Sequence, residues 1–367
     1  MKEEKHTCDI CHEERDLSEL TYFDESYLCE DCLRRETFIC RDCGDRHWND
    51  DSADGDLCQT CYDEDYVRCE RCDAVIHYDD ACYHEDEEYH DHPYCRDCFD
   101  MDEIIHDYYY KPEPIFYGDG PRYLGVELEL DDGGENEFCA SKLLEIANNG
   151  CERMYIKHDG SLDDGFECVT HPMTLDYHIN QMPWRAILNK AVAKGYLSHQ
   201  AGTCGLHVHI SRNALGANYE EQEATIAKIL YFYEKFWNEI LTFSRRTESQ
   251  AEHWARRYGG GIINPKETLK HAKNSHMGRY AAVNLENEAT IEMRIFRGTL
   301  KYNTFIATLQ MVDEICKVAI SLSDEFMQGL TWLDFVKGIA DDKQELINYL
   351  KEKRLYVNEP IRNEVEI

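Results

Sequence analysis

Twelve cysteines near the amino terminus form six C-x-x-C pairs, and this pattern constrains the fold more than any other feature of the chain. The pairs are Cys8/Cys11, Cys29/Cys32, Cys40/Cys43, Cys58/Cys61, Cys69/Cys72 and Cys95/Cys98. The first, third and fifth pairs each start a repeat of about 30 residues. Within a repeat, 17, 14 or 22 residues separate its two pairs. A repeat this short cannot bury enough apolar surface to fold alone. Each repeat therefore needs another source of folding energy.

Zinc is the best source of that energy. Two C-x-x-C knuckles supply the four thiolates of a tetrahedral Zn2+ site, and metal binding would then drive folding of the module. Disulfides or isolated redox pairs are the alternative, but three repeats of paired knuckles favour metal. We predict three tandem zinc-ribbon-like modules over residues 1–98. In the third module the spare ligands that could replace a cysteine are Cys82, His77, His84, His90 and His92.

The amino-terminal part of the chain is strongly acidic. Residues 1–110 contain 35 Asp and Glu against 10 Lys and Arg, which is −25 of the net charge of −34. Such a surface repels nucleic acid and anionic lipid, so we expect neither partner and interpret the modules as an arm that recognises a protein or peptide. Solubility alone is the other interpretation. The charged start MKEEKHTC and the lack of a long apolar stretch lead us to expect a cytoplasmic protein.

Three apolar segments farther along the chain carry pairs of polar side chains two residues apart. They are GVELEL with Glu127 and Glu129, LHVHIS with His207 and His209, and TIEMRIF with Glu292 and Arg294. In a β-strand such residues share one face, so each segment would have a polar and an apolar face. Crowded carboxylates repel one another unless cations neutralise them. One such pair alone would be a solvated strand face, but three predict a surface for divalent metal ions and phosphate.

Periodicity predicts an α+β domain that follows a connector at residues 99–121. Strands are expected at 122–130, within 153–170, and at 205–211, 278–286 and 289–297. Helices are expected at 139–148, 176–195, 219–243, 302–322 and 342–353, with a polar loop at 245–265. This arrangement favours an antiparallel sheet with helices on one face. We assign residues 122–325 to the catalytic domain and residues 326–367 to a C-terminal helical segment.

Four motifs of this domain resemble those of a known family. They are G-x-E-x-E, DGS with a following G-F-E-x-V-T-x-P, C-G-x-H-V-H-I-S, and R-Y-x-x-V-N followed by I-E-x-R-x-F-x-G-T. Together and in this order, they resemble the cellular and phage-encoded amidoligases of the glutamine synthetase and glutamate-cysteine ligase superfamily. The resemblance covers roughly residues 121–320 and leaves out the cysteine modules.

The resemblance implies a glutamine synthetase-like curved sheet with two or three Mg2+ or Mn2+ ions between ATP and a substrate carboxylate. The implied ligands of the metal nearer the ATP phosphates are Glu127, His207 and Glu292. Those of the metal nearer the substrate are Glu129, Asp159 and Glu167. His209 would face the nucleotide phosphates or a third metal, and Arg294 would contact the transferred phosphoryl group.

Asp159 departs from the family pattern, because a longer glutamate stands there in glutamine synthetase. Active-site groups that a neighbouring subunit supplies in that enzyme have no recognisable equivalent here, and the oligomeric state stays open.

The remaining candidates follow from the chemistry of amide formation. A carboxylate needs activation, and an acyl phosphate provides it through phosphoryl transfer, which depends on positioning and on cations. Arginines that fit this need are Arg279, Arg297, Arg245, Arg246, Arg256 and Arg257, of which Arg256 and Arg257 are expected at the nucleotide. A solvated basic loop is the alternative for those between 245 and 257. Asn284 could hydrogen-bond the substrate, and no residue stands out as the general base.

We therefore expect an ATP-dependent carboxylate–amine ligase that acts on an amino-bearing and a carboxylate-bearing substrate, with a peptide or protein among the candidates. One alternative is a zinc-scaffold binding protein whose ligase domain no longer turns over. The other is a phosphotransferase of the related guanidino-kinase branch, which holds ATP mainly with arginines.

Overall fold

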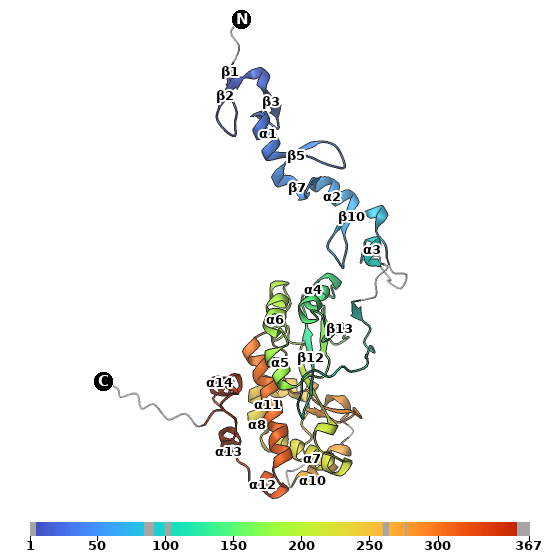
Figure 1. Ribbon diagram of the computed structural model, residues 1–367, viewed down its shortest axis with the longest axis vertical. Helices are drawn as coiled ribbons and strands as arrows, with labels where there is room; N and C mark the ends of the chain where they lie inside the picture. The colour runs from blue at the N-terminus through green and yellow to red at the C-terminus, as the bar shows by residue number, and fades with distance from the viewer. Residues whose placement is uncertain (1–4, 84–91, 100–103, 260–263, 276, 358–367) are drawn as a thin grey trace, which may run out of the picture. The chain divides into compact units, whose positions relative to one another are not determined.

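The computed structural model describes residues 5–83, 92–99, 104–259, 264–275 and 277–357. It divides the chain into two compact units, Met1–Asp102 and Glu103–Ile367 (Figure 1). The cysteine repeats form the first unit, and the paired polar motifs lie in the second.

Each cysteine repeat is built from short hairpins and a short helix. The first repeat contains β1 (Lys5–Thr7), β2 (Glu14–Asp16), β3 (Leu20–Phe23), β4 (Ser26–Cys29) and α1 (Glu30–Glu36). The second contains β5 (Thr37–Ile39), β6 (Arg46–Trp48), β7 (Ser52–Asp54), β8 (Leu57–Cys58) and α2 (Gln59–Asp65). The third contains β9 (Tyr66–Arg68), β10 (Val75–His77) and α3 (Arg96–Phe99). The second cysteine pair of the first two repeats begins the helix, with Cys29 and Cys58 as N-caps.

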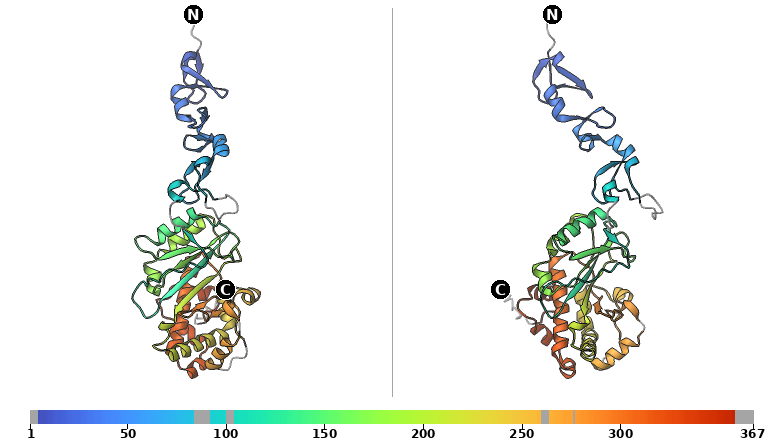
Figure 2. Two further views of the ribbon diagram at one scale, coloured as in Figure 1. Left: turned by 90° about the vertical axis from the view of Figure 1, so that its right-hand side faces the viewer. Right: turned by 45° about the vertical axis from the view of Figure 1, so that its right-hand side comes forward.

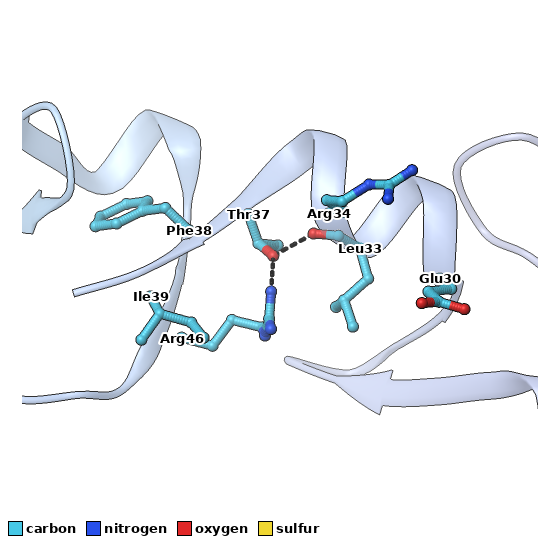
Figure 3. Close-up of a pocket in the computed structure, with 7 residues that line it drawn as sticks. All are labelled: Glu30, Leu33, Arg34, Thr37, Phe38, Ile39 and Arg46. Atoms are coloured by element: carbon cyan, nitrogen blue, oxygen red, sulfur yellow. Dashed lines mark hydrogen bonds between the residues drawn. The ribbon is translucent and has the colours of Figure 1, made fainter. Parts of the chain in front are cut away.

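Neighbouring repeats contact one another through side chains. Trp48 packs against Phe23 of the preceding repeat, with ring centroids 5.2 Å apart, and its indole N–H donates to Asp24 over 2.7 Å. A shallow pocket lies between α1 and the β5–β6 hairpin, where Thr37 accepts a hydrogen bond from Arg46 over 2.7 Å (Figure 3). These contacts join the first two repeats.

The second unit contains a seven-stranded sheet, which confirms the mixed α+β class. Its order is β11-β13-β14-β12-β15-β17-β16. The strands are β11 (Ile105–His106), β12 (Leu124–Leu130), β13 (Met154–Lys157), β14 (Phe166–Thr170), β15 (Leu206–Ser211), β16 (Val283–Asn284) and β17 (Thr290–Met293). The expectation of a wholly antiparallel sheet is wrong at one edge, because β11 pairs parallel with β13. That strand comes from the segment predicted as a connector, of which Ile105 and His106 pair with β13.

The helices of the second unit are α4 (Glu137–Ala147), α5 (Leu175–Asn180), α6 (Trp184–Ala193), α7 (Tyr219–Lys235), α8 (Trp237–Ser244), α9 (Glu248–Trp254), α10 (Pro265–Lys273), α11 (Tyr302–Ser321), α12 (Asp324–Gly329), α13 (Trp332–Lys337) and α14 (Gln344–Glu352). The predicted helix 219–243 is two helices that meet at Phe236. The predicted loop 245–265 contains α9, which starts with a reciprocal capping box between Thr247 and Gln250. Most of the predicted strand 278–286 is also absent among the described residues, because Gly278–Tyr280 form a 3-10 turn before β16.

The apolar face of the sheet forms the core with the helices. Val126, Leu128, Val208 and Ile210 belong to one buried cluster with side chains of α6, α7 and α11. Figure 2 shows α11 running beside the strands. In the part of the chain that the structure describes, no helix has both the length and the apolar character needed to cross a bilayer. The other face of the sheet is left for the polar pairs.

Candidate active site

The central strands bring the paired polar side chains into cross-strand register on one face of the sheet. The facing pairs are Glu127 with His207, Glu129 with Glu167, and His209 with Glu292. Alternation along each strand places the apolar residues between them in the core. The sheet register therefore gathers residues from four segments of the sequence at one place.

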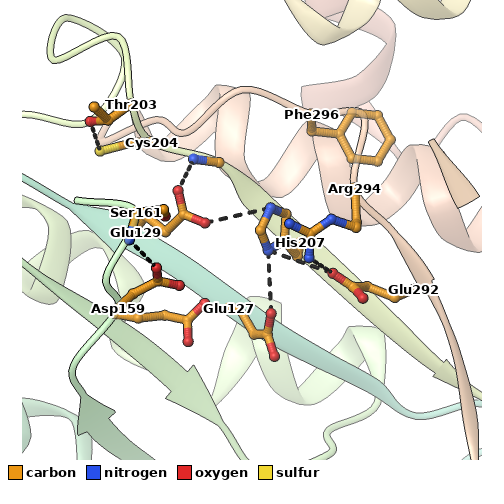
Figure 4. A network of polar contacts seen from close by, with 12 residues as sticks. Glu127, Glu129, Asp159, Ser161, Thr203, Cys204, His207, Glu292, Arg294 and Phe296 are labelled. Carbon is orange, nitrogen blue, oxygen red and sulfur yellow. Dashed lines mark hydrogen bonds and ion pairs between the residues drawn. The ribbon is translucent and has the colours of Figure 1, made fainter. Parts of the chain in front are cut away.

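One group of potential ligands comprises Glu127, His207 and Glu292, whose ligand atoms all lie within 4.8 Å of one another. His207 Nδ1 is 3.2 Å from Glu127 Oε2 and 3.6 Å from Glu292 Oε1 (Figure 4). His209 Nε2 lies 3.1 Å from the other oxygen of Glu127. Two carboxylates and an imidazole at this spacing could hold a divalent cation.

A second group shares the same imidazole. The ligand atoms of Glu129, Glu167 and His207 also lie within 4.8 Å of one another, and His207 Nε2 is 3.6 Å from Glu129 Oε1. Asp159, expected as a third carboxylate, falls outside this group among the described residues. Its carboxylate instead accepts the backbone N–H of Ser161 over 2.8 Å (Figure 4). The structure thus brings two of the three expected carboxylates together, with the short aspartate beside them.

The two groups differ in their electrostatics. Burial raises the pKa of Glu167 well above its ordinary value, and the Glu127 charge adds to this while Lys157 opposes it. Burial also raises the pKa of Glu129. Burial opposes ionisation of Glu127 too, but His209 and His207 overcome it and lower the pKa of Glu127 well below its ordinary value. The carboxylates of the second group are therefore harder to ionise than that of Glu127, and a divalent cation would favour their ionised form.

Gly205 makes room for the shared imidazole. A Cβ at this position would lie 2.5 Å from His207 Nε2, closer than any side chain tolerates. The Gly205 N–H also donates to the buried carboxylate of Glu129. These contacts give a physical reason for glycine in the C-G-x-H part of the motif.

Arg294 and Asn284 both bind the Glu292 carboxylate. Arg294 Nη1 lies 2.6 Å from Glu292 Oε1, and Asn284 Nδ2 donates to Glu292 Oε2 over 2.8 Å. The two side chains therefore orient a potential ligand. The buried Nε of Arg294 has no hydrogen-bond partner, so this arginine keeps a donor for a further group.

A family model matches part of the second unit. Residues 148–316 match the family model described as "Putative amidoligase enzyme". The chain carries an amidoligase-family domain. The match supports a ligase-type function, and it covers Glu167, His207 and Glu292 but not β12. A search of curated proteins gave no match.

The other predicted arginines of the amidoligase domain are engaged in different places. Arg257 pairs with Glu234 of α7, with Nη2 and Oε2 3.0 Å apart. Arg256 donates to the carbonyl of Glu252 over 2.6 Å. The Arg257 contact joins this segment to α7 and the Arg256 contact joins it to α9, and the nucleotide role expected for both arginines stays a prediction.

Arg279 and Arg297 occupy two further environments. Arg279 Nη1 donates to the phenol of Tyr108 over 2.6 Å, and Nη2 donates to Tyr280 over 3.1 Å. Arg297 lies beside Arg245, which donates to its backbone carbonyl, and the Nε of each is buried without a hydrogen-bond partner. Tyr108 belongs to the segment predicted as a connector, and it places that segment against a predicted site residue.

Two polar residues of the amidoligase domain, the buried Asp131 and the half-buried Lys157, were missed from the sequence. Asp131, 1% exposed, accepts hydrogen bonds from Thr203 and from three backbone N–H groups. Lys157 faces Glu167 on the neighbouring strand. Arg246, which the sequence did suggest, donates to backbone carbonyls beside β17, and burial lowers its pKa to about 10. The strand period of two carried a signal for the first two, because Asp131 follows Glu129 by two residues and Lys157 follows Tyr155 by two.

The amino-terminal unit contains three four-cysteine groups that could bind zinc. Each brings together the two pairs of one repeat, with all four Sγ atoms within 4.8 Å. Burial raises the pKa of the Cys8 and Cys40 thiols, but hydrogen bonds from backbone N–H groups outweigh this effect and lower both pKa values to about 6. Among the described residues of the third repeat, Cys82, His77 and His92 lie outside the four-cysteine group. His84 and His90 lie outside the described residues.

Proposed function

We propose that the amidoligase domain is an ATP-dependent carboxylate–amine ligase that forms an amide or isopeptide bond through an acyl phosphate. The observation that carries this proposal is the pair of ligand groups that share His207 on one buried sheet face. Mg2+ or Mn2+ held there would neutralise the phosphate oxygens of ATP and the substrate carboxylate. We also propose that the sheet belongs to the curved glutamine synthetase-like type.

The donor set fits these metal ions. Glu127, Glu292 and His207 would hold the ion nearer the phosphates, since oxygen and imidazole ligands suit Mg2+ and Mn2+. Glu129 and Glu167 would hold the ion nearer the substrate, with the charge of Asp159 close by. The remaining side chains then have supporting roles.

Those roles follow from the contacts. His209 fixes one oxygen of Glu127 and leaves the other for the ion. Arg294 and Asn284 fix the Glu292 carboxylate. The free Nε of Arg294 offers a fixed positive group near the transferred phosphoryl.

The reaction has two steps. A carboxylate oxygen of the acid attacks the γ-phosphorus, and the bond to the bridging oxygen breaks with release of ADP. The amine nitrogen then attacks the acyl carbon, and phosphate leaves with the electron pair of the carbon–oxygen bond while the nitrogen loses a proton. We assign no residue as the acceptor of that proton.

We further propose that the three four-cysteine groups hold structural Zn2+ and that the acidic arm recognises a protein or peptide partner. Two knuckles per site, with four thiols close together, suit zinc. Reduced thiols of this number are typical of the cytoplasm, where we place the reaction. A basic partner would complement the charge of the arm.

Hydroxylamine trapping tests the ligase proposal. The full zinc-loaded chain is incubated with ATP, Mg2+, hydroxylamine and a panel of amino acids, dicarboxylic acids and peptides. We expect a hydroxamate from at least one acid and an equal amount of ADP. Glu292→Gln should lower the yield by roughly 100-fold or more, whereas Glu288→Gln, an exposed glutamate of the same hairpin, should leave it unchanged.

Each alternative has its own result. Transfer of the phosphoryl group to a guanidino compound without hydroxamate would favour the phosphotransferase. The absence of both products, together with zinc binding by the arm, would favour the scaffold without turnover.

A further inference from the structure

Lys157 holds an unusual position for a lysine. It lies at the end of β13 directly opposite Glu167 of β14, and its side chain is only 15% exposed. Its ammonium nitrogen is 3.0 Å from Glu167 Oε2, and the Glu167 side chain is 2% exposed. The lysine therefore points into the sheet face and not into solvent.

The partner of this lysine is a member of the second ligand group. Glu167 lies within 4.8 Å of Glu129 through their ligand atoms, and both carboxylates are buried. The compact ammonium against Glu167 is a monovalent cation beside the place where a divalent ion would bind. An ion arriving there would meet a like charge within a few ångströms, in a region where water screens poorly.

The first ligand group is arranged differently. Its cationic neighbour, Arg294, contacts Glu292, but Asn284 holds the other oxygen of that carboxylate in place. A guanidinium is a planar fork suited to remain beside an ion, whereas an ammonium on a flexible stem can move away. In this same position Lys157 Nζ lies 5.5 Å from the centroid of the Tyr108 ring, a contact that the ammonium could keep when it leaves Glu167.

We propose that Lys157 occupies the second cation position while nucleotide is absent. The resting domain then binds one divalent ion, at Glu127, His207 and Glu292. It takes up the second only together with ATP. The γ-phosphate, which the substrate carboxylate attacks, would bring negative charge to the substrate side, compensate the added positive charge and allow the ammonium to withdraw. This inference rests on the proposed metal-dependent function and adds an order of loading to it.

Counting bound Mn2+ tests the inference. The full zinc-loaded chain is dialysed to equilibrium against Mn2+, with or without a non-hydrolysable ATP analogue, and protein-bound manganese and zinc are counted by elemental analysis. Mn2+ ranks below Zn2+ in affinity, so it leaves the four-cysteine sites filled with zinc. We expect about one Mn2+ per chain without the analogue and about two with it.

Variants give the matched comparison. Lys157→Met keeps the apolar stem without the charge and should bind about two Mn2+ without nucleotide. Lys157→Arg, which keeps the charge, should still bind about one. Lys142→Met removes a surface lysine that pairs with Glu145 over 2.7 Å and should behave as the native chain.

The outcomes separate this inference from the proposed function. Two Mn2+ on the native chain without nucleotide would overturn the inference and leave the ligase proposal standing, and this test needs no variant. A folded Lys157→Met chain that still binds one ion would overturn it as well. No bound Mn2+ under any condition would overturn both.

Discussion

Replacing Asp131 by asparagine should destabilise the amidoligase domain more than its small chemical change suggests. The buried Asp131 carboxylate accepts four hydrogen bonds, from the Thr203 hydroxyl at 2.5 Å and from the backbone N–H groups of Asp132, Asp163 and Asp164 at 3.0, 3.2 and 2.7 Å. An amide has one acceptor oxygen. At least one of these N–H groups would then face a donor, and the remaining bonds would lose their ionic character. We estimate a loss of about 2 to 4 kcal/mol in unfolding free energy.

Urea unfolding followed by tryptophan fluorescence measures this loss. Four of the five tryptophans belong to the second unit, and Trp48→Phe removes the one in the cysteine repeats, so the signal reports the amidoligase domain. Asp132→Asn is the matched control, because Asp132 is exposed and has a φ of 61°, a left-handed conformation that asparagine adopts readily. If Asp131→Asn unfolds at the same urea concentration as Asp132→Asn, the carboxylate does not stabilise the loops as we describe.

Three further predictions concern the ligand groups, pH and zinc. Gly205→Ala should displace His207 and lower hydroxamate formation roughly 100-fold. Gly338→Ala is the control, because Gly338 has a φ of −81° that alanine adopts readily, and it should leave hydroxamate formation unchanged. Equal yields from the two variants would contradict the steric argument. Burial lowers the pKa of His178 to about 4, so the folded chain resists a proton that the unfolded chain accepts near pH 6.5. The stability contributed by neutral His178 is complete above that pH and is lost as the pH falls towards 4, by up to about 3 kcal/mol. The unfolding free energy measured in urea should therefore depend less on pH in His178→Gln than in the native chain. An unchanged pH dependence would refute this prediction. Zinc chelation should allow proteolysis within the cysteine repeats while the amidoligase domain stays intact, and resistance of the repeats would argue against structural zinc.

Much of the ligand geometry followed from strand periodicity. Residues two apart share a face, so Glu127 and Glu129, or His207 and His209, had to lie together once their segments formed strands. The apolar residues between them had to enter the core, as Val126 and Leu128 do. Periodicity did not give the register between strands, which is what places His207 between two carboxylate groups. That choice depends on how the apolar faces pack against the helices.

The ion-pair partners of long side chains such as arginine and lysine were the least predictable feature of the site. The charge of Arg257 suggested a phosphate ligand, and in the structure its guanidinium forms an ion pair with Glu234 of α7. Lys157 looked unremarkable, yet its strand pairs with the one that carries Glu167. Some helices could have been predicted from neighbouring residues, and α9 is one of them, because Thr247 and Gln250 form a capping box at its start. Long-range pairing is settled by the folded chain, whereas capping can be read from neighbouring residues.

Mass spectrometry of a complete reaction tests the central claim most directly. The zinc-loaded chain is incubated with ATP, Mg2+ and an extract that contains metabolites and peptides, beside the Glu292→Gln and Glu288→Gln variants. The account predicts a new species whose mass equals that of two consumed species less one water, with an equal amount of ADP, for the native chain and Glu288→Gln only. A product that gains a phosphoryl group instead, or a condensation product that Glu292→Gln forms equally well, would contradict it.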